Sequence, residues 1–210
     1  MTSQAGVSVV ADRLHTRAVR LEWFTVGWNV TEAVVAIGAG IVAGSVALIG
    51  FGADSLIEVI SAVALLWRLR RAGPNAGAEE HGYAEHRALY LVSATFFLLA
   101  AYIGYEAITA LIGAEEPNSS MIGLILSVLS LVVMPALAVM KQRIGREMGS
   151  QALQADAVET WVCAYLSLAL LVGVGLHAAF GLWWADPMGA LAMLPVILWQ
   201  GWETLGETRE

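Results

Sequence analysis

The sequence predicts an all-α membrane protein with six transmembrane helices and both termini on the cytoplasmic side. Of its 210 residues, 58% are hydrophobic and only 14% are charged, and the charged residues fall in clusters. A soluble domain needs a larger share of charged residues to cover its surface. The apolar runs between the clusters are long enough to cross a bilayer. We therefore expect a multi-pass protein of the cell membrane.

Six apolar runs have about the 20 residues that cross the hydrocarbon core as a helix. They cover approximately 20–41, 45–67, 88–112, 119–140, 151–176 and 184–205. A short Ala-Gly-Ser turn separates the first two runs. Asp186 and Pro187 begin the last run, where Asp is expected to cap the helix and Pro fits its first turn. The predicted organisation is a cytoplasmic segment over 1–19, a transmembrane domain over 20–205 and a short cytoplasmic tail over 206–210.

The basic residues support both the number of helices and their orientation. All eleven Lys and Arg residues lie in the N-terminal segment up to Arg20, in the loops over 68–87 and 141–146, or in the tail. With six helices these regions share one face of the membrane, which the positive-inside rule makes the cytoplasmic face. The net charge of −7 argues against nucleic acid as a partner, since a phosphate backbone attracts a basic surface.

Two acids interrupt the second apolar run. Asp54 and Glu58 are four residues apart, so they lie on one face of a helix. A carboxylate at bilayer depth is costly and marks a functional site by default, although a structural hydrogen bond or ion pair is the plainer explanation for a single acid. No Lys or Arg lies in the interior of any predicted span. We therefore expect no fixed cation near these acids. They must be protonated, hydrogen-bonded in a wet cavity or neutralised by a transient cation, and two adjacent like charges suit proton-linked cation binding.

The fifth run carries a second pair with the same spacing, Glu159 and Cys163. Carboxylate and thiolate are both metal ligands, and two such pairs on facing helices have the donors of a tetrahedral site. A lone cysteine is more often a small buried apolar residue. Asp156, one turn before Glu159, is expected to be a cap or to lie at the mouth of the site.

With these residues the chain resembles the transmembrane domain of the cation diffusion facilitator family. The segment GSVALIGFGADSLIE is similar to the family's second-helix pattern and places Asp54 and Glu58 at its two ligand positions. The segment ADAVETWVC resembles the fifth-helix pattern, with Asp156, Glu159 and Cys163 at the positions of Asp, His and Asp. The resemblance thus implies a metal site of Asp54, Glu58, Glu159 and Cys163 between the second and fifth helices.

Two further segments are similar to the family. HGYAEHRAL resembles the start of its third helix, and WADPMGALAM the start of its sixth. Together the four motifs cover nearly all of 20–205. The sequence departs from the family in its fifth-helix ligands and in ending soon after the sixth run, so we expect no C-terminal metal-binding domain. Carboxylate and thiol in place of imidazole and carboxylate also change the metals that the site prefers.

The resemblance implies a transporter of divalent transition-metal ions, exporting them from the cytoplasm in exchange for protons. Zn²⁺ is the favoured cargo, and Cd²⁺, Mn²⁺, Co²⁺ and Fe²⁺ are alternatives. We expect no prosthetic group and a homodimer held by the membrane part or the short loops. We also expect no enzymatic activity, since the chain lacks an HExxH motif and a nucleophile paired with a base. A membrane metal sensor or an accessory subunit of the same fold is the main alternative. A proton-coupled exporter of organic cations also needs membrane acids, but has no use for Cys163.

Several other polar residues remain open. Asn29 and Glu32 in the first run and Glu106 in the third are candidates for cavity lining or for hydrogen bonds between helices. His81 and His86 lie near three acids in the second loop, where an accessory metal site competes with ordinary solvated charges.

Overall fold

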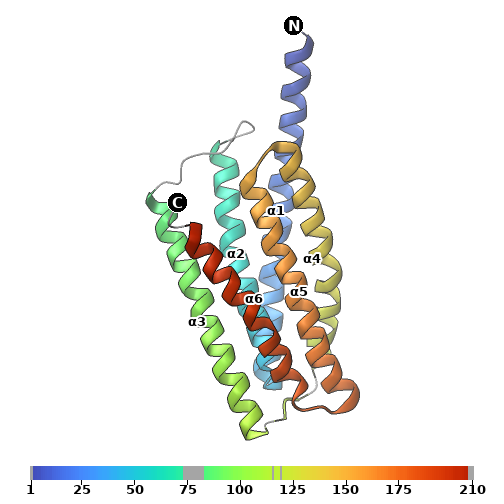
Figure 1. Ribbon diagram of the computed structural model, residues 1–210. Coiled ribbons are helices and arrows are strands. Elements are labelled where there is room, and N and C mark those ends of the chain that lie inside the picture. Colours follow the sequence, from blue (N-terminus) through green and yellow to red (C-terminus); the bar gives the residue numbers. More distant parts are fainter. Residues whose placement is uncertain (1, 73–82, 115, 119, 208–210) are drawn as a thin grey trace.

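The computed structural model describes residues 2–72, 83–114, 116–118 and 120–207, and within them it contains six α-helices and no strand (Figure 1). The helices are α1 (Thr2–Ala43), α2 (Val46–Ala72), α3 (Tyr83–Gly113), α4 (Met121–Met148), α5 (Gln151–Phe180) and α6 (Ala185–Glu207). The predicted all-α fold with six helices is confirmed. His81 lies outside the described residues, and only the backbone of His86 is described, as part of α3.

Helices α1 to α5 are long and apolar enough to cross a membrane. Helix α6 is less apolar, since its 23 residues include two prolines, Asp186 and Gln200. The outer surface of the bundle carries large apolar side chains. Val34, Leu98 and Val132 are each about 70% exposed, as lipid-facing positions are expected to be. These are the features of a multi-pass integral membrane protein.

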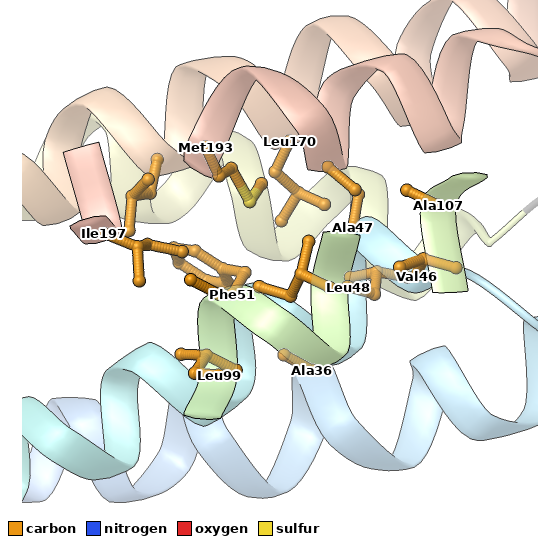
Figure 2. Close-up of a cluster of buried hydrophobic side chains, with 14 of the residues drawn as sticks. Ala36, Val46, Ala47, Leu48, Phe51, Leu99, Ala107, Leu170, Met193 and Ile197 are labelled. Carbon is orange, nitrogen blue, oxygen red and sulfur yellow. The ribbon is translucent and has the colours of Figure 1, made fainter. Parts of the chain in front are cut away.

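Helices α2 and α5 lie at the centre of the helix contacts. Helix α2 packs against α1, α3, α5 and α6, and α5 packs against α2, α4 and α6. A buried apolar cluster holds these helices together. It includes Phe51 and Leu48 of α2, Leu170 of α5 and Met193 of α6 (Figure 2). The two helices that carry the predicted ligands therefore pack directly against each other.

The N-terminus, the C-terminal end of α2 and the loop between α4 and α5 lie toward the same end of the bundle (Figure 1). These are segments to which the sequence assigns its basic residues, so their placement at one end agrees with the predicted helix order. Which side of the membrane this end faces stays a prediction.

The α4–α5 loop is closed by matched caps. The hydroxyl of Ser150 accepts a hydrogen bond from the backbone N–H of Leu153, 3.3 Å away, at the start of α5. Gly149 ends α4 with a φ of +66°, a left-handed conformation that glycine adopts at no steric cost. The reversal between the two helices is therefore specified by adjacent residues.

Helix α4 ends later than predicted. The fourth apolar run ends at residue 140, but the helix continues to Met148. Lys141 and Gly145, four residues apart, keep the buried face of α4 going beyond that run. Hydropathy marks where the lipid-compatible surface ends, whereas the helix extends for as long as one face can pack.

Asp186 does not cap the sixth helix, so that prediction is wrong. It lies in the first turn of α6, and its buried carboxylate accepts hydrogen bonds from Ser45 Oγ at 2.5 Å and from the backbone N–H of Val46 at 3.0 Å. It therefore satisfies the otherwise unpaired N–H groups at the start of α2. One carboxylate thus joins the first turns of α2 and α6.

The backbones of α5 and α6 approach each other closely at Gly173 and Gly189. A Cβ atom at Gly173 would lie 3.0 Å from the carbonyl oxygen of Ala185 and 3.3 Å from the Cα of Gly189. Both neighbours are backbone atoms, which cannot rotate away. Small residues at helix crossings commonly permit such contact in membranes.

Gly173→Ala should therefore destabilise the protein by about 1–3 kcal/mol, the usual cost of overpacking. Gly104→Ala is the matched control, because its Cβ would meet only Leu194, at 3.6 Å. That change should be neutral or stabilise by up to about 1 kcal/mol, because alanine favours the helix. Thermal unfolding of the purified protein in detergent measures both, and equal tolerance of the two changes would contradict the close approach.

Candidate metal centre

A small cavity lies between the two helices that carry the predicted ligands. Its lining comes from Asp54, Ile57, Glu58 and Ser61 of α2, Phe96 of α3, Glu159 and Cys163 of α5, and Gln200 of α6. All four predicted ligands are included. The cavity volume is about 10 Å³, room for about one water molecule. In this conformation it is large enough for a bare metal ion and far too small for an organic cation.

Cys163 joins the two acids of α2. Its Sγ lies 2.6 Å from Glu58 Oε2 and 3.3 Å from Asp54 Oδ2, so one thiol proton faces two carboxylate oxygens. All three side chains are at least 95% buried. The i, i+4 spacing on α2 brings both carboxylates to the face that meets α5, as the sequence predicts.

Glu159 lines the same cavity but has a different partner. Its Oε2 accepts a hydrogen bond from Ser61 Oγ at 2.7 Å. Ser61 is seven residues after Asp54, two helical turns along the same face of α2. In this conformation, no three His, Cys, Asp or Glu side chains of the described chain are arranged to hold a metal ion. The structure thus gathers the four predicted donors around one cavity without closing them into a coordination shell.

A fixed cation lies beside this site, which contradicts the expectation from the sequence. Lys141 of α4 is wholly buried and forms ion pairs with Asp156 and with Glu22, whose Oε2 is 3.5 Å from Nζ. Lys141 is the first residue after the apolar run. Because α4 continues past it, the side chain packs inside the bundle instead of reaching water.

Thr160 connects Lys141 to the candidate ligands. Its hydroxyl accepts a hydrogen bond from Lys141 Nζ at 3.1 Å and lies 3.1 Å from Glu58 Oε1, to which it can donate. The predicted cap-or-mouth role of Asp156 is replaced by that of a buried ion-pair partner. Lys141 therefore balances part of the negative charge around the cavity without contacting Asp54 or Glu58 itself.

Gln200 is a lining residue that the sequence analysis did not single out. It is 8% exposed, and its side-chain Oε1 has no hydrogen-bond partner among the described residues. An unpaired buried amide oxygen needs a partner. Neutral glutamine occurs in many structural settings, so only its place in the cavity marks it as a fifth potential donor.

Glu106 lies away from the cavity. It lines a separate hollow near the ends of α1 and α3, together with Tyr102, Glu116 and Asp186. The expectation that Glu106 lines a cavity is met there, in a different place from the candidate ligands.

Comparison with known proteins agrees with this architecture. The sequence model of the cation efflux transmembrane domain family matches residues 23–210, nearly the whole chain. An uncharacterized transporter of Synechocystis sp. is 30% identical over 175 residues, which cover 82% of this chain and 56% of that protein. An uncharacterized transporter of Methanocaldococcus jannaschii is 28% identical over 174 residues, covering 80% of this chain and 60% of that protein.

Transmembrane protein 163 of Xenopus laevis is 23% identical over 167 residues, which cover 80% of this chain and 58% of that protein. The chain thus spans little more than half the length of these curated relatives. Its match to the family model nevertheless extends through all six helices. The chain therefore belongs to the cation efflux family, whose members are membrane transporters of cations.

Proposed function

We propose that the protein carries divalent transition-metal ions across the membrane and exports them from the cytoplasm in exchange for protons. The metal would bind between α2 and α5, at Asp54, Glu58, Glu159 and Cys163. The contact of Cys163 with Asp54 and Glu58 carries this proposal, because donors from two helices already converge on one ion-sized cavity.

The chemistry of the donors links metal binding to proton release. A thiol must lose its proton to bind a metal, and a carboxylate must be ionised. The thiol proton that Cys163 donates to Glu58 lies between two of the proposed metal donors. An arriving metal would displace it, and a returning proton would weaken the hold on the metal. Rocking of helix groups about this site would expose it to each side in turn.

The proposed site also requires a movement of Glu159. Its carboxylate is bound to Ser61, so it must leave that hydroxyl to join the other three donors. The half-buried Glu159 has more freedom than Asp54 or Glu58. We therefore assign it the closing role, in which it completes the shell after the metal has met the other three donors.

A mixed set of three carboxylates and one thiolate favours Zn²⁺ or Cd²⁺ through the sulfur and tolerates Mn²⁺, Co²⁺ or Fe²⁺ through the oxygens. Cys163→Ser should therefore reduce Zn²⁺ and Cd²⁺ uptake at least ~10-fold relative to Mn²⁺. Uptake is measured with purified protein in liposomes under a pH gradient. Adding Ser167→Cys to this variant moves the thiol one turn along α5 and should not restore the preference. An unchanged preference in Cys163→Ser would remove the thiol from the metal site.

A sensor or accessory subunit of the same fold would bind the metal without moving it. The liposome assay separates these possibilities, because a transporter must accumulate metal against its gradient when protons flow the other way. Tight binding in detergent with no uptake at any pH gradient would support the sensor.

A further inference from the structure

A second buried polar cluster meets α2 on a face adjacent to the one that lines the cavity. Asn29 and Glu32 are three residues apart on α1, so they share one face of that helix. Glu32 Oε2 accepts a hydrogen bond from Ser55 Oγ of α2 at 3.3 Å, and Ser130 of α4 lies close to the same carboxylate. All four residues are wholly buried.

This cluster has polar atoms without partners. Glu32 Oε1 and both amide atoms of Asn29 have no hydrogen-bond partner among the described residues. The indole of the neighbouring Trp28 lies close to the Glu32 carboxylate. A buried, unpaired carboxylate oxygen is costly in hydrocarbon, so an atom or ion that is not part of the chain is expected to contact it.

Apolar packing closes this cluster on one side. Ala36 and Phe51, each one helical turn from Glu32 and Ser55, belong to the apolar cluster (Figure 2). Ser55 is also the residue next to Asp54, so the two faces of α2 meet the two polar regions at consecutive positions. A bound atom or ion at Glu32 would therefore lie beside the segment of α2 that carries the proposed metal ligand Asp54.

We propose that Glu32 and Asn29 form a second cation site, which holds one monovalent cation, Na⁺ or a proton. The side chains supply one carboxylate, one amide oxygen and the hydroxyls of Ser55 and Ser130. Oxygen donors suit a hard cation, and a single negative charge balances a single positive one. The charged or titratable groups that act on Glu32 are Glu58 of α2 and Cys163 of α5. The idea rests on the proposed transport function, because a proton here would be its counter-ion and Na⁺ here would take the place of the proton in the exchange.

Thermal unfolding of the purified full chain in detergent tests the site without requiring transport. Wild-type protein is compared in NaCl and in choline chloride of equal ionic strength, each over a range of pH. A cation that binds only the folded state should raise Tm by roughly 5–10 °C at about 100 times its Kd. Glu32→Gln keeps the hydrogen bond to Ser55 but lacks the charge, and should lose this response. Glu106→Gln is the matched control and should retain it.

A Na⁺ response that depends on Glu32 identifies sodium, and a pH response alone that depends on Glu32 identifies a proton. If wild-type and Glu32→Gln protein respond equally to Na⁺ and equally to pH, the proposal is overturned, and a buried water is left as the occupant. If Glu32→Gln does not fold, Asn29→Leu and Ser55→Ala take its place and should each weaken the response.

Asp54→Asn separates this proposal from the metal site. It should lose divalent metal binding and keep the Glu32-dependent response. A wild-type protein that binds no divalent metal but shows that response would reject the metal site alone. Metal binding together with a response that ignores Glu32 would reject the second site alone.

Discussion

Asp54→Asn should reduce metal uptake into liposomes by at least ~100-fold. Asp54 is 97% buried, lines the cavity and contacts the Cys163 thiol. The amide has the same shape but no charge, so it cannot help to neutralise a divalent ion. Changing a group that only supports a metal ligand already costs about 10–100-fold, and a direct ligand should cost more. Uptake of Zn²⁺ under a pH gradient is the measurement.

Glu106→Gln is the control for this prediction, because it removes an acid from a different part of the bundle. It should leave Zn²⁺ uptake within about twofold of wild type. If the loss of any acid in the membrane part reduced uptake, Glu106→Gln would reduce it as well. Full uptake by Asp54→Asn would place the metal elsewhere.

Lys141→Met should destabilise the folded protein by about 3–5 kcal/mol, the usual cost of breaking a buried ion pair on one side. Lys141 is wholly buried between Glu22 and Asp156, and these two carboxyl groups also lie close to each other. Removing the ammonium leaves two buried acids uncompensated. Methionine keeps most of the apolar length of the side chain, so the loss of stability comes mainly from the missing charge and little from a change in volume. Thermal unfolding in detergent measures it.

Neutralising the partners tests the cause. In Lys141→Met with Glu22→Gln and Asp156→Asn, both direct ion-pair partners are neutral, and most of the lost stability should return. Failure to recover would mean that Lys141 acts through packing or through its hydrogen bond to Thr160.

Much of the fold could be predicted from the sequence because lipid imposes a simple rule. Each spanning segment must satisfy its own backbone hydrogen bonds and present apolar side chains outward, so long apolar runs correspond to helices. The i, i+4 spacing of Asp54 with Glu58 and of Glu159 with Cys163 then fixed which side chains share a face. The contact between these faces of α2 and α5 depends on tertiary packing, which the spacing does not reveal. It could be expected only from the resemblance to a family.

The features that were missed depend on contacts between distant parts of the chain. Lys141 follows an apolar run directly, where a lysine normally marks the membrane surface. Only the packing of α1, α4 and α5 shows that its partners Glu22 and Asp156 lie inside the bundle. Asp186 likewise carries the local signal of a helix cap, but the N–H groups it satisfies belong to α2, about 140 residues earlier.

The location of a bound metal tests the central claim most directly. Crystals of the full chain grown with Zn²⁺ or Cd²⁺ should show an anomalous scattering peak between α2 and α5, bounded by Asp54, Glu58 and Cys163 and with Glu159 turned away from Ser61. A strong peak elsewhere in the membrane part, with the thiol of Cys163 still bound to Glu58, would contradict the proposed site.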